Sequence, residues 1–177
     1  MNRHKVLVPL DGSSFSRQIL PYIQEFLPPA ENELILLRVG ERPAGHVGRP
    51  ARLTATESPV AIPESPQDVV AAAHPIYASQ EMESAQAEFQ REVQAERQAL
   101  EAAGYRVTCQ VRFGEPGPEI VKYIELHDVD LVAMTTHGRT GLGRLLFGSV
   151  AEYVTRHISI PMMVLRPSPA GGSRSTG

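Results

Sequence analysis

The sequence has one cysteine, Cys109, little net charge and no long apolar run. A single cysteine cannot form a disulfide within the chain, so we expect a reducing compartment, the cytoplasm. No apolar stretch approaches the roughly 18 residues of a membrane helix, and the first one, 6–10, is too short for a secretory signal. The net charge of −3 gives no support for a general nucleic-acid binder, which usually has a basic surface. We therefore expect neither a membrane nor a nucleic acid as partner.

Short apolar runs alternate with helical patterns along the chain. The length of 177 residues, with 42% hydrophobic residues, suits one domain with a core. Alternation of this kind predicts parallel strands covered by helices on both faces. The strands are expected at 5–10, 33–39, 105–113, 129–135 and 161–166. The helices are expected at 17–27, 78–103, 114–127 and 149–157. The pattern thus predicts an α/β fold, a doubly wound sheet of five strands.

Two regions depart from this alternation. Residues 40–77 are rich in proline and alanine and have no sustained periodicity, which predicts a flexible excursion. Residues 167–177 consist mostly of small and polar residues, which predicts a disordered tail. We therefore expect a single domain over 1–166, interrupted by the excursion.

The segment "THGRTGLGRLLFGS", 136–149, concentrates glycine and arginine after a probable strand. It lacks the Gly-Lys-Ser/Thr of a Walker A loop. A dinucleotide fingerprint would need glycine where Leu146 stands, and a nucleophile elbow would need it where Phe147 stands. What remains is an anion site made by the backbone. Gly138 follows the strand, and Gly148 and Ser149 open a helix whose free N–H groups favour a phosphate. Ser149 could instead cap that helix.

Several stretches together resemble the universal stress protein family. They are "VLVPLDGS", "LLRV", "THGRTGLGRLLFGSVAEYV" and "IPMMVLRP". The ATP-binding branch of that family carries G-x2-G-x9-G-S/T. Gly138, Gly148 and Ser149 match its last three positions, and Thr135 replaces its first glycine. The resemblance implies a Rossmann-like, adenine nucleotide alpha hydrolase-like sheet with strand order 3-2-1-4-5. It also implies ATP as ligand, with Mg²⁺ held by the phosphates, and a homodimer through the strand at 160–166.

The same resemblance implies the residues of the site. In the order 3-2-1-4-5 the first and fourth strands are neighbours, which would bring the end of the first beside Thr135 and Gly138. The family pattern assigns Asp11 to the adenine or ribose and Val39 to the adenine face. Asp11 could also serve as the N-cap of the following helix. The expected nucleotide contacts are Pro9, Leu10, Asp11, Val39, Met134, Thr135, Gly138, Arg139, Gly148, Ser149 and Val150.

Three functions are compatible with these residues. The first is nucleotide binding in a regulatory or stress-response role. The second is a nucleotide-free dimeric scaffold, because Thr135 departs from the motif: its methyl group could crowd the ribose, or its hydroxyl could donate a useful hydrogen bond. The third is slow ATP hydrolysis or phosphate transfer. No catalytic base, metal-binding carboxylate cluster or catalytic lysine is recognisable, so we assign no catalytic residue and no metal ligand.

Overall fold

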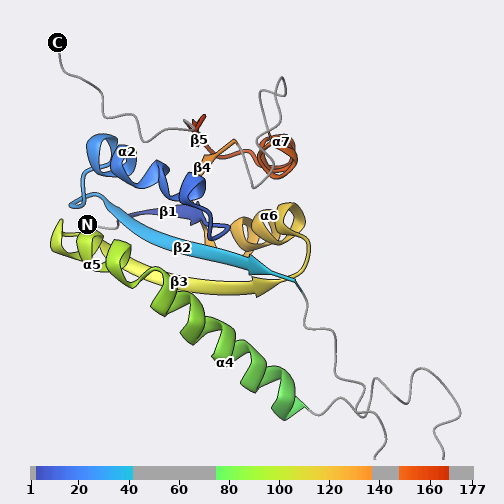
Figure 1. Cartoon of the computed structure of the whole chain (residues 1–177). Helices are drawn as coiled ribbons and strands as arrows, with labels where there is room; N and C mark the ends of the chain where they lie inside the picture. Colours follow the sequence, from blue (N-terminus) through green and yellow to red (C-terminus); the bar gives the residue numbers. More distant parts are fainter. Residues whose placement is uncertain (1–2, 42–74, 137–147, 168–177) are drawn as a thin grey trace, which may run out of the picture.

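The computed structural model describes residues 3–41, 75–136 and 148–167, and in these it forms a five-stranded parallel sheet (Figure 1). The strands are β1 (His4–Pro9), β2 (Asn32–Gly40), β3 (Arg106–Phe113), β4 (Leu131–Thr135) and β5 (Met162–Leu165). Their order in the sheet is β3-β2-β1-β4-β5, and every pairing is parallel. The predicted fold class and strand order are therefore confirmed.

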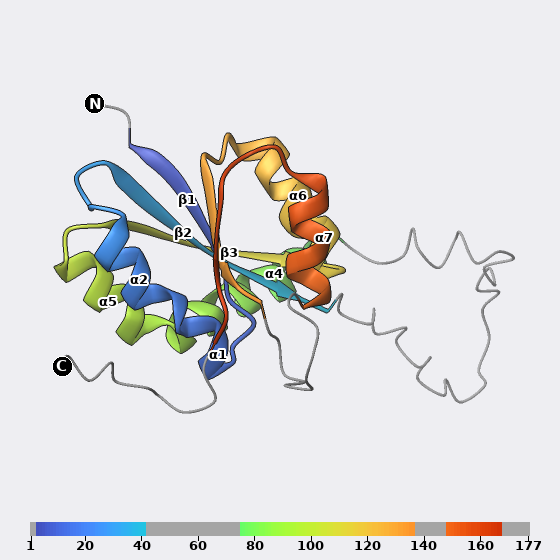
Figure 2. The same ribbon diagram turned by 90° about the horizontal axis from the view of Figure 1, so that it is seen from above.

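Helices cover the sheet on both faces, as Figure 2 shows with the sheet between them. The described helices are α1 (Ser14–Arg17), α2 (Ile19–Phe26), α4 (Pro75–Glu92), α5 (Gln94–Ala102), α6 (Pro116–His127) and α7 (Ser149–His157). Residues of α2, α4 and α5 share one hydrophobic cluster with the sheet, on what we call the α2–α4 face. Residues of α6 and α7 share the other, on the α6–α7 face.

Strand β1 shows how the sequence builds both clusters. Side chains alternate along a strand, so Val6 and Val8 lie on the α2–α4 face of the sheet and Leu7 lies on the α6–α7 face. All three are fully buried. An uninterrupted apolar run is therefore the pattern required of a strand covered on both sides.

The predicted helix at 17–27 begins earlier and has a break. Ser13 is the N-cap of α1, and Gln18 interrupts the helix between α1 and α2. Pro21 then lies in the first turn of α2, where a missing N–H costs nothing. Proline thus confines the regular helix and does not kink it.

The predicted helix at 78–103 is in fact two helices, α4 and α5, separated at Val93. Helix α4 begins at Pro75 and β2 continues to Gly40, so the excursion predicted for 40–77 was too long at both ends. Its remainder, 42–74, lies outside the described residues, as do 168–177 of the predicted tail. The apolar spacing within 78–103 predicts that Met82 lies on the buried face, but Met82 is exposed.

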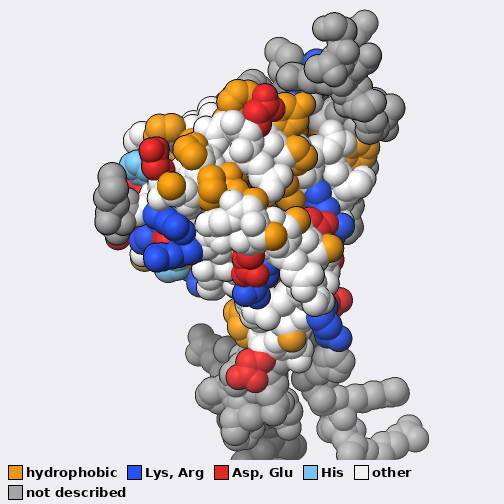
Figure 3. Space-filling view, turned by 90° about the vertical axis from the view of Figure 1, so that its left-hand side faces the viewer, with side chains coloured by type: hydrophobic (Ala, Val, Ile, Leu, Met, Phe, Trp, Pro, Cys, Tyr) orange, Lys and Arg blue, Asp and Glu red, His pale blue; other side chains and the backbone are white. Residues whose placement is uncertain are grey.

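The amino end of the sheet is held by polar contacts. Lys5 N donates to Asp130 Oδ2 at 2.7 Å, and Lys5 Nζ donates to the carbonyl of His127 at 2.9 Å. Figure 3 views the molecule from the side where the strands begin, and there hydrophobic side chains alternate with charged ones. Within the described ranges, no helix is long and apolar enough to cross a membrane.

Candidate functional site

The sheet changes winding direction between β1 and β4. These strands pair at Val6↔Leu131 and Leu7↔Val132, whereas β1 stays paired with β2 as far as Pro9↔Leu37. After β1 the chain enters helices on the α2–α4 face, and after β4 it reaches α7 on the α6–α7 face. The carboxyl ends of β1 and β4 therefore form the switch point at which open α/β sheets bind ligands.

Three of the predicted contact residues lie at the end of β1. Leu10 is buried, and its N–H donates to the carbonyl of Leu37 at 2.8 Å, which extends the contact with β2 past the last strand residue. Pro9 and Asp11 are half-buried on either side of it. The chain thus holds Asp11 at the carboxyl edge of the sheet.

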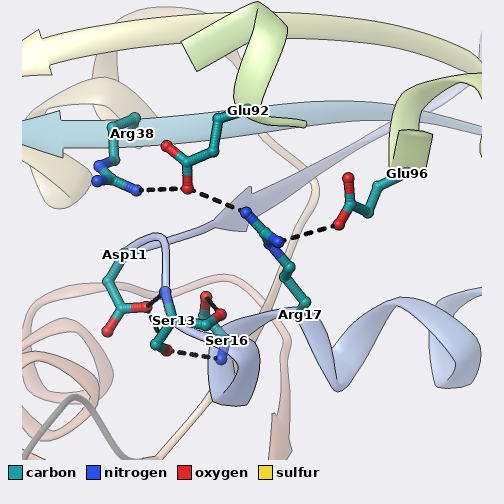
Figure 4. Close-up of polar contacts among 7 residues, drawn as sticks. All are labelled: Asp11, Ser13, Ser16, Arg17, Arg38, Glu92 and Glu96. Atoms are coloured by element: carbon teal, nitrogen blue, oxygen red, sulfur yellow. Dashed lines mark hydrogen bonds and ion pairs between the residues drawn. The ribbon is translucent and has the colours of Figure 1, made fainter. Parts of the chain in front are cut away.

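Asp11 is tied to the start of α1 through Ser13. Asp11 Oδ1 accepts hydrogen bonds from Ser13 N at 2.9 Å and from Ser13 Oγ at 2.6 Å (Figure 4). Ser13 Oγ in turn accepts from Ser16 N at 3.1 Å, so Ser13 is the N-cap of α1. The alternative assignment of Asp11 as N-cap was wrong. Asp11 instead orients the residue that caps the helix.

These contacts decide the charge of Asp11. Partial burial raises the pKa of its carboxyl group, but the hydrogen bonds from Ser13 and Ser16 and the nearby charge of Arg38 together lower the pKa below 3.8. The group is therefore a carboxylate at neutral pH, a hydrogen-bond acceptor for any hydroxyl or amino group that reaches it.

The turn between Asp11 and Ser13 is covered by charged side chains. Gly12 has φ +82°, and a Cβ there would meet Arg38 Nη1 and lie 2.9 Å from Glu92 Oε1. The positive φ favours glycine at this position, because a side chain would strain it. Sequence reasoning missed this arrangement, although a lone arginine in the apolar strand "ELILLRVG" was a signal for it.

The end of β4 meets the start of α7. Met134 and Thr135 are buried, and Thr136 N donates to the carbonyl of Leu165 at 2.9 Å. Gly148 N donates to the carbonyl of Thr136 at 2.5 Å, which brings the start of α7 to the end of β4. Two residues distant in sequence, Thr136 and Gly148, are thus adjacent at the carboxyl edge.

Gly148, not Ser149, is the N-cap of α7, and no side chain in the described part of the chain makes a capping hydrogen bond there. The capping role considered for Ser149 was therefore wrong. Ser149 is exposed in the first turn, and Val150 is half-buried against the α6–α7 cluster. Because the Gly148 amide is already bonded to Thr136, the N–H groups left for an anion are those that follow it in the first turn.

The structure thus brings together the predicted residues from β1, β4 and α7. Val39 stands on β2, the other neighbour of β1, and packs on the α6–α7 cluster to which Met134 also belongs. Gly138 and Arg139 lie outside the described residues. Apolar side chains, one carboxylate and a helix N-terminus are what this edge offers a ligand.

The described residues offer little reactive chemistry. Among them, no group of three or more histidine, cysteine or acidic side chains could hold a metal ion. Cys109 is buried on the α2–α4 face, and burial raises the pKa of its thiol, which keeps it protonated. Cysteine is among the residues most often buried, which predicts a core position for Cys109, and the structure confirms it.

Known proteins similar to this chain share one family. A family model described as the universal stress protein family matches residues 2–166. Universal stress protein MJ0531 of Methanocaldococcus jannaschii is 35% identical over 79 residues, which are 45% of this chain and 46% of that protein. Universal stress protein MJ0577 of the same organism is 39% identical over 67 residues, 38% of this chain and 41% of that protein. The alignments span less than half the length of these relatives.

Solved structures share the fold at low sequence identity. The structure of MJ0577 superposes with a TM-score of 0.66 at 23% identity, over 96% of this chain and 100% of that one. A universal stress protein in complex with cAMP gives 0.55 at 18% identity, over 95% and 100%. A universal stress protein family protein from Arabidopsis thaliana with AMP bound gives 0.53 at 16%, over 94% and 93%. These likenesses establish the fold.

Proposed function

The chain belongs to the universal stress protein family, and we propose that it binds ATP or another adenine nucleotide in a regulatory or stress-response role. The site is the carboxyl edge between β1 and β4, closed by the start of α7. The protein would act through its nucleotide-bound and nucleotide-free forms. Its single cysteine supports a cytoplasmic location.

One observation carries the proposal: the uncapped start of α7 held at the end of β4. The bond from Gly148 N to Thr136 O fixes the helix there, and among the described residues no side-chain hydrogen bond caps its N-terminus. A helix N-terminus concentrates free N–H groups and positive dipole charge, which suits a phosphate. Ser149 is exposed in the same turn and can add its hydroxyl.

The other end of the ligand would lie toward β1 and β2. Val39 and Met134 belong to the face on which α7 packs, and they would offer apolar surface to the adenine ring. The carboxylate of Asp11 would accept a hydrogen bond from the ribose or the adenine amino group. The motif adds Gly138 and Arg139 as phosphate contacts.

Two structural neighbours support an adenine nucleotide as the ligand class, since one is a complex with cAMP and another has AMP bound. A Mg²⁺ ion would come with a triphosphate, held by the phosphate oxygens. At the α7 end the described residues offer N–H groups and a hydroxyl, which suit phosphate oxygens. The described residues contain no acidic cluster that would hold the metal ion directly.

We extend the proposal to a homodimer built through 160–166. In the sheet order β5 is an edge strand, and Val164 is 38% exposed on it. Unpaired backbone groups on an apolar edge favour pairing with a second copy. Two copies related by a twofold axis would satisfy each other's edge.

Mass spectrometry of nucleotide released from gently purified protein tests the proposal. We expect an adenine nucleotide in substantial amount, and calorimetry with ATP, ADP, AMP and cAMP should then rank the ligands. Protein free of nucleotide that binds none of the four would favour the dimeric scaffold instead. Phosphate release from bound ATP would favour slow hydrolysis.

A further inference from the structure

We propose that Arg38 and Glu92 are positioning residues of the nucleotide site: their ion pair lies across Gly12 and holds the 11–13 turn in the form that the ligand meets. This inference rests on the proposed function, because the turn carries Asp11 into the site. Neither residue touches the ligand in this scheme. They act through the backbone between them and Asp11.

The ion pair is placed directly against the turn. An added Cβ on Gly12 would meet the two terminal guanidinium nitrogens of Arg38, Nη1 and Nη2, and would lie 2.9 Å from Glu92 Oε1. The pair itself, Arg38 Nη1 to Glu92 Oε1, measures 3.4 Å. The turn is therefore backed by two charged groups, and the left-handed φ of Gly12 lets them approach.

Glu92 is fixed by a second arginine. Arg17 Nη2 lies 3.0 Å from the same Oε1 atom, and Arg17 Nη1 lies 3.3 Å from Glu96 Oε1 (Figure 4). The four side chains come from β2, α1, α4 and α5, and each is 23–31% exposed. A single ion pair in water holds its partners weakly, but a network of four partly buried groups restricts each member.

The position of Arg38 indicates support and not direct contact. Leu36 belongs to the α2–α4 cluster and Val39 to the α6–α7 cluster, so alternation along β2 directs Arg38 to the α2–α4 face. The α7 terminus that would hold the phosphates lies on the opposite face. Arg38 thus approaches the turn from the side of the sheet opposite to the proposed phosphate site.

A preformed turn should strengthen binding because the ligand then does not have to order it. Asp11 and Ser13 hold each other through two hydrogen bonds, but these fix only the local geometry. The Arg38–Glu92 pair connects that local unit to β2 and to the end of α4. Its loss should free the turn while the helix cap and the sheet remain.

Three variants of the full chain test the proposal. Arg38→Met and Glu92→Met each remove one half of the pair and keep an unbranched stem. Glu96→Met is the matched control, because it removes a carboxylate from the same network but not from the turn. The readouts are hydrogen exchange of the Ser13 amide without ligand, and nucleotide affinity by calorimetry.

We expect Arg38→Met and Glu92→Met to speed up Ser13 exchange and to weaken nucleotide binding about threefold to tenfold. Glu96→Met should change both much less, because the Arg38–Glu92 and Arg17–Glu92 pairs remain. Unchanged Ser13 exchange in the first two variants would overturn the positioning role, whether or not nucleotide binds. Undiminished binding by Glu92→Met would also overturn it, since binding would then not depend on the pair, and tighter binding would indicate that the released Arg38 contacts the ligand itself. A wild-type chain that binds no nucleotide would overturn the proposed function. Hydrogen exchange of the Ser13 amide would still test whether the ion pair holds the turn.

Discussion

Ser13 has two roles in the first loop, as N-cap of α1 and as hydrogen-bond donor to Asp11. We expect Ser13→Ala to lower the free energy of unfolding by about 1 kcal/mol at neutral pH through loss of the cap. Ser14→Ala is the matched control, because Ser14 is exposed in the next position. Urea unfolding of the two variants beside the wild type measures the difference, and equal stabilities would contradict the capping role.

The same variant should change how stability depends on acid. The hydrogen bonds from Ser13 contribute to the lowered pKa of Asp11, so this carboxylate stabilises the fold above its ordinary pKa of 3.8. That contribution disappears as pH falls from 3.8 through the lowered value. In Ser13→Ala the pKa should move back up and the loss on acidification should shrink. Parallel stability curves for the wild type and the variant below pH 3.8 would rule this out.

Gly148 offers a test of the phosphate site that leaves the fold intact. Its φ of −70° and ψ of 155° suit any residue, so Gly148→Val should fold normally. The branched side chain would stand where a phosphate approaches the first turn of α7. Each lost phosphate hydrogen bond costs about 1.5–3 kcal/mol, which is about tenfold or more in affinity. Calorimetry should show a smaller loss for Gly148→Ala, and wild-type affinity in both variants would refute the placement.

At the level of single residues, part of the site could be predicted from the sequence and part could not. The family motif indicated Gly148 and Ser149, and the family pattern indicated Asp11. The structure places all three at the carboxyl edge of the sheet, and their contacts with a nucleotide stay a prediction. The pattern could not show that the Gly148 amide bonds to Thr136, because that bond depends on how α7 meets β4. Nor could it show Arg38 and Glu92 at Gly12, since the two are separated in sequence by the whole 42–74 segment.

The helices show the same limit at the scale of elements. Three- and four-residue spacing predicts a buried stripe at Met82, Ala85, Phe89, Val93, Leu100 and Ala103. Phe89, Val93 and Leu100 are buried, whereas Met82 and Ala103 are exposed. The spacing missed the break at Val93 because both helices present apolar residues to the same cluster, so the stripe continues across the break. Apolar spacing reports which residues are buried. It does not report whether the backbone between them is one helix or two.

A glycine directly after the helix predicted at 78–103 indicates a C-cap at Gly104, and the structure confirms this position and gives a test. Gly104 N donates to Glu101 O at 2.9 Å and Tyr105 N to Leu100 O at 3.1 Å, the Schellman pattern, with Gly104 at φ +95°. We expect Gly104→Ala to destabilise the protein by about 1 kcal/mol, because alanine strains this φ. Gly104→Asn should cost less, since asparagine tolerates the conformation. Thermal unfolding that ranks alanine above asparagine would contradict the assignment.

For the whole molecule, strand order follows from connectivity more than from any one residue. Strand–helix alternation predicts a parallel sheet, but the order β3-β2-β1-β4-β5 requires knowing which face each helix covers. That information came from the family resemblance. In the structure it appears as the separate clusters of α2, α4 and α5 on one side and α6 and α7 on the other. The reversal between them creates the edge at which we propose that the nucleotide binds, and it also leaves β5 at the edge of the sheet.

The open side of β5 can be deduced from its bonds to β4. Val132 N donates to Pro161 O at 3.1 Å and Thr136 N to Leu165 O at 2.9 Å. Backbone groups of alternate residues point the same way, so Met163 also faces β4, whereas Val164 directs its N–H away from the sheet. Val164 is therefore the residue whose amide a second copy would use.

Val164→Pro should thus convert a homodimer to a monomer while the sheet remains, because proline removes an amide that β4 does not need. Val164→Ala is the control, since it shortens the side chain and keeps the N–H group. If pairing between backbones holds the dimer, sedimentation should find Val164→Pro monomeric and Val164→Ala still dimeric at a concentration where the wild type is dimeric. Dissociation of both variants would instead assign the contact to the exposed valine side chain. A dimer that survives Val164→Pro would place the interface elsewhere on the molecule.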